Sequence, residues 1–159
     1  MTPQERVQLA LRELGIPSTV VEFEASTHTA QDAADAVGCE LGQIVKTLFF
    51  LADGRPTAAL VAGDRQVDTA KLASIVGVGR KKLKMANPDD VLMRTGYAVG
   101  GVPPVGLETD ADMVVDDSLQ RFGRVWAAAG TSNAVFEVGT EELAASIKGQ
   151  WAAITKDGE

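Results

Sequence analysis

The stretch Ile44–Ala52, with the sequence IVKTLFFLA, is the most apolar part of the chain. Its β-branched and aromatic residues predict a buried strand. The turn Asp53-Gly54-Arg55-Pro56 follows, and after it comes a second apolar run, Thr57 to Ala62. Two such runs joined by a glycine-containing turn predict a β-hairpin at the centre of a sheet.

Helix-start signals recur on both sides of this hairpin. Polar N-cap residues precede apolar runs with helical spacing, and glycines end several of these runs. The predicted helices are Pro3–Leu14 after the capping box of Thr2 and Glu5, Ala30–Val37 after Thr29, Thr69–Val76 after Asp68, a short helix from Pro88 to about Gly96 after Asn87, and Glu141–Lys148 after Thr140.

Further strand-like runs are short and lie between these helices, at Thr19–Phe23, Met113–Val115, Val125–Ala128 and Ala134–Val138. Short strands interleaved with short helices, with hairpins among them, predict an α/β (α+β) fold. We expect a single domain over residues 1–159, in which helices flank a mixed, mostly antiparallel sheet.

The 159 residues are 45% hydrophobic and 23% charged, which is typical of a globular domain. No apolar run approaches the roughly 20 residues that a membrane span needs. The N-terminus lacks the apolar core of a signal peptide. We therefore expect a cytoplasmic protein that makes no membrane contact.

One cysteine and one histidine are present. An internal disulfide is excluded, and so is a zinc site built on cysteine and histidine, which needs three or four such ligands. A catalytic triad would have to use His28. No carboxylate or nucleophile lies at a local spacing that supports a triad, so His28 is either a general base or an exposed loop residue.

Lys46 interrupts the apolar strand. A charge held in a cleft for an anion or a carbonyl oxygen is one explanation, because a buried ammonium is costly without partners. The alternative is a lysine near a strand end that extends its charged group into water.

Two loops could form the walls of a pocket. In Gly100-Gly101-Val102-Pro103-Pro104-Val105-Gly106 the glycines allow a ligand to approach the backbone and the prolines fix the loop. No Lys-Ser/Thr pair follows, so the loop is not a P-loop, and a tight apolar turn is the alternative. Gly130-Thr131-Ser132-Asn133 either lines a pocket for a small side chain or forms a polar hairpin turn.

Arg80-Lys81-Lys82-Leu83-Lys84 places four basic residues within five positions, although the whole chain has a formal charge of −7. The cluster predicts either a phosphate contact or a solvated face. With the preceding residues 69–79 it also resembles a helix-turn-helix, and a DNA-binding regulator is therefore an alternative function. The recognition helix would have to begin near Gly79, and Asn87-Pro88 would cut it short.

Four motifs follow one another along the chain: the lysine strand Ile44–Leu48, the Gly-Asp strand end Gly63–Asp68, the glycine–proline loop Gly100–Gly106 and the run Val125–Thr131. In this order they resemble the YbaK family, the free-standing relatives of the editing domain inserted in bacterial prolyl-tRNA synthetase. The resemblance covers nearly the whole chain and implies a mixed sheet curled towards a barrel. It also implies trans-editing, which is hydrolysis of the ester of a mischarged aminoacyl-tRNA.

The resemblance implies a role for each matching position. Lys46 would be the catalytic residue and would hold the substrate near the aminoacyl ester or the terminal phosphate. The glycine–proline loop would contact the substrate carbonyl and ribose, and the other matching positions would form the amino-acid pocket. The substrate-binding residues implied in this way are Thr29, Gly100, Gly101, Pro103, Gly106, Gly130, Thr131 and Ser132.

An aminoacyl ester is already activated, so the protein mainly has to position it and to stabilise the oxyanion with backbone N–H groups. A ribose 2′-hydroxyl, a substrate thiol or a bound water can assist, and neither a metal nor a cofactor is expected. The small residues around Thr131 suggest a small amino acid. Family members can also gain tRNA affinity from an aminoacyl-tRNA synthetase, and a relative that binds tRNA or a synthetase without turnover is a further alternative.

Basic and acidic residues are segregated along the chain. Between residues 65 and 94 bases predominate, whereas Glu108, Asp110, Asp112, Asp116 and Asp117 fall in one acidic stretch. We expect a polarised surface whose basic side meets the tRNA acceptor stem with weak, salt-sensitive affinity. The expected tRNA contacts are Lys71, Arg80, Lys81, Lys82 and Lys84.

Overall fold

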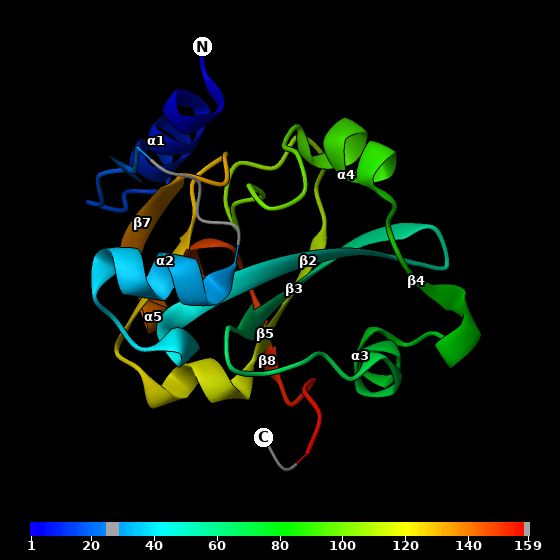
Figure 1. Ribbon diagram of the computed structural model, residues 1–159. Helices are drawn as coiled ribbons and strands as arrows, with labels where there is room; N and C mark the ends of the chain where they lie inside the picture. The colour runs from blue at the N-terminus through cyan, green and yellow to red at the C-terminus, as the bar shows by residue number, and fades with distance from the viewer. Residues whose placement is uncertain (25–28, 158–159) are drawn as a thin grey trace.

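The central hairpin consists of β2 (Ile44–Ala52) and β3 (Arg55–Ala62), which cross the middle of the molecule (Figure 1). The two strands pair antiparallel from Val45–Ala62 to Ala52–Arg55. The two residues between them, Asp53 and Gly54, have φ values of 50° and 85°. Positive φ at both central residues is typical of the type I′ turn of two-residue hairpins, and the predicted hairpin is confirmed.

The computed structural model describes residues 1–24 and 29–157. Over these residues the strands form one mixed sheet with the order β1-β7-β6-β2-β3-β5-β8, and β4 pairs with β2 beside this path. The other strands are β1 (Val21–Glu22), β4 (Leu83–Met85), β5 (Asp112–Asp116), β6 (Arg124–Ala128), β7 (Ala134–Gly139) and β8 (Gln150–Ala152).

The sheet contains both antiparallel and parallel pairs of strands. The hairpins β2–β3 and β6–β7 are antiparallel, as are β1–β7 and β2–β4. β6 runs parallel to β2, β5 parallel to β3 and β8 parallel to β5. The longest ladders are antiparallel, so the predicted mixed, mostly antiparallel α+β architecture is confirmed.

The helices begin and end close to the predicted positions. Capping boxes on Thr2 and Thr29 and the side chains of Asp68 and Asn87 begin the first four helices. At the last helix the prediction is wrong by one residue, because Gly139 is the N-cap and the Thr140 hydroxyl instead donates to the Phe122 carbonyl. The helices are α1 (Pro3–Glu13), α2 (Ala30–Val37), α3 (Thr69–Val76), α4 (Pro88–Thr95) and α5 (Thr140–Ser146).

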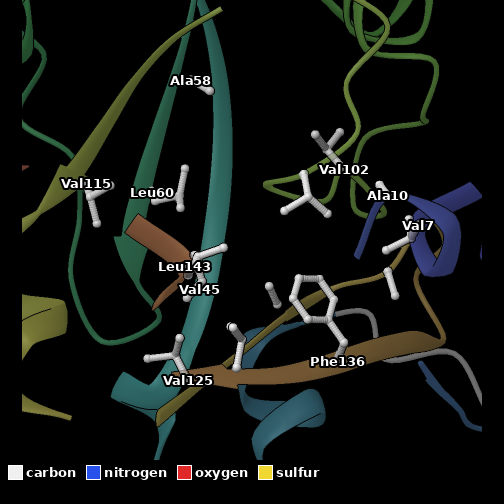
Figure 2. Packing of buried hydrophobic residues seen from close by; sticks show 14 of the residues in the cluster. Val7, Ala10, Val45, Ala58, Leu60, Val102, Val115, Val125, Phe136 and Leu143 are labelled. Atoms are coloured by element: carbon white, nitrogen blue, oxygen red, sulfur yellow. The ribbon is translucent and has the colours of Figure 1, made fainter. Parts of the chain in front are cut away.

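The two faces of the sheet are covered by different elements. On one face Val45, Leu60 and Phe136 pack with Val7 of α1 and Val102 of a long loop (Figure 2). On the other face Phe50, Val61 and Val114 pack against α3. Because β2 is covered on both sides, its sequence is almost continuously apolar.

The helix-turn-helix alternative is wrong. After α3, residues 80–82 form the short 3₁₀ helix η2, and residues 83–85 form β4 against β2. No recognition helix is present where one was required.

Three strands differ from the sequence-based expectation. The strand expected over Thr19–Phe23 is only two residues long, and β4 and β8 were not predicted. Within the described ranges, no helix has the length and apolar character that a membrane crossing requires.

Candidate functional site

A cavity of about 310 Å³ opens where β2, β6, α2 and two loops meet. Five of the residues proposed from the sequence line it: Lys46, Thr29, Gly100, Thr131 and Ser132. They come from four separate segments of the chain. The remaining lining residues are Ala30, Ala33, Ile44, Val45, Thr47, Leu48, Val99, Val102, Trp126, Ala127, Ala128, Ala134 and Val135.

Lys46 lies half-buried in the first half of β2, beside this cavity. Its Nζ donates a hydrogen bond to the backbone carbonyl of Arg65 at 2.5 Å. That carbonyl belongs to the turn that follows β3, so the lysine ammonium is held at a defined place and does not simply extend into water.

The first half of the glycine–proline loop reaches the cavity through a tight turn. The Gly101 N–H donates to the Ala98 carbonyl at 3.0 Å, and Gly100 has a φ of +92°. A glycine is required there because a turn with positive φ at its third position is strained for other residues. Gly100 therefore presents bare backbone to the cavity.

The two pocket loops are joined backbone to backbone. The Gly130 N–H donates to the Gly101 carbonyl at 2.9 Å. A Cβ atom on Gly101 would lie 2.7 Å from the Gly130 oxygen and from the Thr131 Cα, so only glycine fits. Gly101 and Gly130 are thus not part of the cavity lining but hold its walls together.

The Thr131 side chain is fixed within its own loop. Its hydroxyl donates to Asn133 Oδ1 at 2.6 Å, and Gln4 of α1 donates to that hydroxyl at 3.4 Å. Asn133 in turn donates to the Phe23 carbonyl at 3.0 Å. This chain of bonds holds the loop wall between α1 and β1.

Pro103 and Gly106 lie away from the cavity lining. Pro103 is buried, and Gly106 packs on α1 so closely that a Cβ atom there would lie 2.8 Å from Ala10 Cβ. Their substrate contacts stay predictions, whereas their contribution to the loop's packing is visible.

The expected tRNA contacts fall into two groups. Arg80, Lys81, Lys82 and Lys84 are exposed, on η2 and β4. Lys71 instead donates to Asp157 Oδ1 at 2.6 Å and to the Thr155 carbonyl at 2.9 Å. The hydrogen bond with Asp157 raises the pKa of Lys71 above its usual value and ties the lysine to the C-terminal segment.

The acidic stretch is less exposed than expected. Asp116 is 1% exposed, and it accepts hydrogen bonds from the Ile154 N–H and from Ser118. It therefore adds nothing to the charged surface, and the expected polarity has to rest on the other four acidic residues.

Several lining residues were missed from the sequence. Ala30 and Ala33 of α2 and Trp126 of β6 pack together with Ile44, and all four line the cavity. Alanines on one helix face indicate packing, so their position in the same cavity as Lys46 could not be recognised from the sequence. His28, the general base considered above, lies outside the described residues. Within the described ranges, no three His, Cys, Asp or Glu side chains gather as a metal site would need.

Comparison with known proteins identifies the family. The model of the aminoacyl-tRNA editing domain family matches residues 24–145. A Bacillus subtilis relative named "Uncharacterized protein YwhH" is 37% identical over 142 residues, and the match covers 88% of each chain. An Enterococcus faecalis relative named "Putative Cys-tRNA(Pro)/Cys-tRNA(Cys) deacylase EbsC" is 30% identical over 143 residues, covering 88% of this chain and 86% of the relative.

A solved structure described as "a putative trans-editing enzyme for prolyl tRNA synthetase" has the same fold. Its TM-score against this chain is 0.93 and its sequence identity is 41%, and the match covers 98% of both chains. This likeness confirms the curled, mixed sheet with flanking helices that the motifs implied. The chain therefore belongs to the aminoacyl-tRNA editing domain family.

Proposed function

We propose that this chain is an aminoacyl-tRNA deacylase that acts in trans, as a single editing domain over residues 1–159. Its substrate would be a mischarged tRNA that carries a small amino acid. One observation carries the proposal: Lys46, the Gly100 turn and Thr131–Ser132, which are far apart in the sequence, line the same cavity. Membership of the editing family supports the substrate class, and the names of two relatives support the reaction.

The chemistry needs few protein groups. Water adds to the ester carbonyl, the carbonyl oxygen takes up negative charge, and the bond to the terminal ribose oxygen then breaks. The proton lost by the water reaches that ribose oxygen through the neighbouring 2′-hydroxyl, a substrate thiol or a second water. Free amino acid and tRNA are released.

Lys46 and the Gly100 turn would act by position and charge. The ammonium held beside the cavity would attract the terminal phosphate or the oxyanion without accepting a proton. The backbone of Gly100, in the glycine–proline loop, would contact the ester in the same cavity. Fixed dipoles and charges aimed at the developing oxyanion are the usual source of rate in such sites.

The walls of the cavity favour a small amino acid. Its volume of about 310 Å³ is at the lower end of the range for ligand pockets, roughly 300–1,000 Å³. Alanines from α2, β6 and β7 form much of the wall. Since one methylene changes binding by only about 1–3 kcal/mol, we expect graded rather than absolute discrimination between neighbouring sizes.

The tRNA would lie along the basic edge of the molecule. Lys84 pairs with Leu51 of β2, five residues beyond Lys46 on the same strand, or about 17 Å at the usual rise. An acceptor stem whose end enters the cavity can span that distance. The solved structure described as "a putative trans-editing enzyme for prolyl tRNA synthetase" supports a synthetase as a second partner.

Deacylation of a charged-tRNA panel tests the proposal. Purified protein is incubated with tRNAs carrying alanine, serine, cysteine, threonine or proline, and ester loss is compared with the spontaneous rate. Lys46→Ala is measured alongside, and Lys156→Ala, a lysine outside the cavity lining, is the matched control.

We expect selective ester loss that disappears in Lys46→Ala and persists in Lys156→Ala. If no member of the panel is cleared faster than in buffer while tRNA still binds, the chain is a binding protein and the hydrolase proposal is wrong.

A further inference from the structure

The Gly-Asp motif at residues 63–68 adjoins the functional lysine without lining its cavity. The Arg65 carbonyl in this segment accepts the hydrogen bond from Lys46 Nζ. The Gly63 N–H donates to the Ile44 carbonyl at 2.7 Å, and the Arg65 N–H donates to the Ala62 carbonyl at 2.9 Å. The turn is therefore attached both to the strand that carries Lys46 and to its hairpin partner.

A second element holds the same turn from outside. Arg121, at the end of the 3₁₀ helix η3 (Asp117–Arg121), makes a two-pronged ion pair with Asp64. Its Nη1 lies 2.9 Å from Oδ2 and its Nη2 lies 2.7 Å from Oδ1. This paired geometry fixes the carboxylate in orientation as well as in distance.

Arg121 is itself held in place. Its Nε donates to the Ser118 carbonyl at 2.7 Å, and its guanidinium lies over the Phe122 ring at 4.9 Å from the centroid. Hydrogen bonds from Arg121 lower the pKa of Asp64 below its usual range, so the pair stays ionised at neutral pH.

The surroundings leave little room for this assembly to move. A Cβ atom on Gly42 would lie 2.9 Å from the Phe122 ring and 3.1 Å from Arg121 Nη2. A Cβ atom on Gly63 would lie 2.5 Å from the Leu41 carbonyl oxygen. Arg121, Phe122 and the turn are therefore packed closely against the segment Leu41–Gly42.

The position of the pair matters more than the stability it supplies. The Asp64 and Arg121 side chains are 33% and 35% exposed, and exposed ion pairs typically contribute about 0–1 kcal/mol, with two-pronged pairs at the upper end. What distinguishes this pair is the group it supports, since one residue beyond Asp64 is the carbonyl that receives the Lys46 ammonium.

We propose that the Asp64–Arg121 pair positions Lys46 by fixing the Arg65 carbonyl to which its ammonium donates. Arg121 is a positioning residue, because it lies outside the cavity lining and acts through the turn. The kinetic side of this proposal rests on the deacylase function proposed above, whereas the structural coupling does not.

Kinetics give the first test, with Arg121→Ala and Asp64→Ala. We expect kcat for deacylation to fall about 10- to 100-fold with KM changed less than about twofold, since misplaced catalytic groups cost turnover more than binding. Arg121→Lys keeps the charge but not the two-pronged geometry, and its kcat should be intermediate. The matched control is Arg55→Ala, which removes an ion pair with Asp112 of 3.9 Å at the far end of β3.

A readout independent of activity separates this proposal from the proposed function. In protein labelled with ¹³C at lysine Cε, the Lys46 resonance is identified by its loss in Lys46→Ala. Arg121→Ala and the milder Arg121→Lys should each shift that resonance, whereas Arg55→Ala should leave it in place. If the resonance shifts but the wild-type protein clears no charged tRNA, positioning stands and the deacylase proposal fails.

An unmoved Lys46 resonance in folded Arg121→Ala or Arg121→Lys would overturn the positioning proposal. A loss of activity that appears only as a higher KM while the Lys46 resonance stays in place would also overturn it, because the pair would then act on binding without Lys46. Equal losses of kcat in Arg121→Ala and Arg55→Ala would also overturn the proposal, because the effect would then come from surface charge in general.

Discussion

Gly101 is the residue at which the two loops of the cavity touch. Its Cβ position lies 2.7 Å from backbone atoms of Gly130 and Thr131, which cannot move aside as a flexible side chain can. We predict that Gly101→Ala separates the loops and lowers kcat/KM for deacylation about tenfold or more, because the walls no longer meet at the ester. The effect is measured from initial rates of deacylation of the aminoacyl-tRNA that the wild-type protein hydrolyses in the panel.

Gly123→Ala is the matched control for this substitution. A Cβ atom there has no heavy atom within 4 Å, so the variant adds the same methyl group without a clash. Unchanged kcat/KM in Gly101→Ala would show that the contact between the loops does not shape the active cavity.

Single residues differ in how well the sequence alone marks them as candidate site residues. Lys46 could be picked out because a charged side chain within an apolar strand is costly to bury. Gly100 was recognisable within a loop rich in glycine and proline. The pairing of Asp64 with Arg121 was not, because 57 positions separate two ordinary surface residues and no local pattern joins them.

At the scale of elements, α2 forms one wall of the cavity, and its first turn depends on Thr29. The Thr29 hydroxyl accepts from the Asp32 N–H at 3.0 Å, and the Asp32 carboxylate accepts from the Thr29 N–H at 3.2 Å. We predict that Thr29→Ala destabilises this helix end by about 1 kcal/mol, the usual value of an N-cap. Amide hydrogen exchange in α2 should then be about fivefold faster.

Thr29→Ser separates capping from contact with the substrate. Serine keeps the capping hydroxyl, so the rate of amide hydrogen exchange in α2 should match that of the wild type. If the threonine methyl group contacts the substrate in the cavity, its loss should raise KM for the aminoacyl-tRNA. Equal exchange rates in Thr29→Ala and the wild type would mean that α2 is held by packing alone.

The last strand is held by a buried carboxylate. Asp116 of β5 accepts from the Ile154 N–H at 2.8 Å and from the Thr155 hydroxyl at 3.2 Å, next to β8. We predict that Asp116→Ala lowers the free energy of unfolding by about 2–4 kcal/mol, because it leaves a buried N–H without a partner. Urea denaturation of this variant and of Asp117→Ala, an exposed neighbour expected to change stability by less than about 0.5 kcal/mol, measures the difference.

Elements with their own local signal were predicted, and elements made by tertiary pairing were not. The four capped helices and the β2–β3 hairpin carry caps, turns and apolar runs that act over a few residues. β8 is three residues long and is a strand because β5 lies beside it. The basic cluster after α3 shows the same limit, since its last residues form β4 by pairing with β2, and no local pattern predicted that strand.

For the molecule as a whole, the formal net charge of −7 has to be compatible with binding of the proposed substrate, a polyanionic tRNA. The exposed bases of η2 and β4 lie at the end of β2 remote from Lys46. The exposed acidic residues are spread over the loop before β5, the first residue of β5 at Asp112 and η3. We expect a tRNA to meet the molecule along the η2–β4 edge. The net charge then limits contact with other nucleic acids, because the rest of the surface repels them.

Salt dependence tests this arrangement. We predict that tRNA affinity falls with added KCl and that the triple variant Lys81→Gln, Lys82→Gln, Lys84→Gln has a shallower slope. Each lost phosphate contact should reduce the slope of log K against log salt by about 0.7–0.9, so three contacts amount to about 2–3. Fluorescence anisotropy of labelled tRNA over roughly 50–200 mM KCl measures it. The variant Arg12→Gln, Lys148→Gln, Lys156→Gln removes the same charge from other elements. If both variants reduce the slope equally, the tRNA responds to net charge and not to the η2–β4 edge.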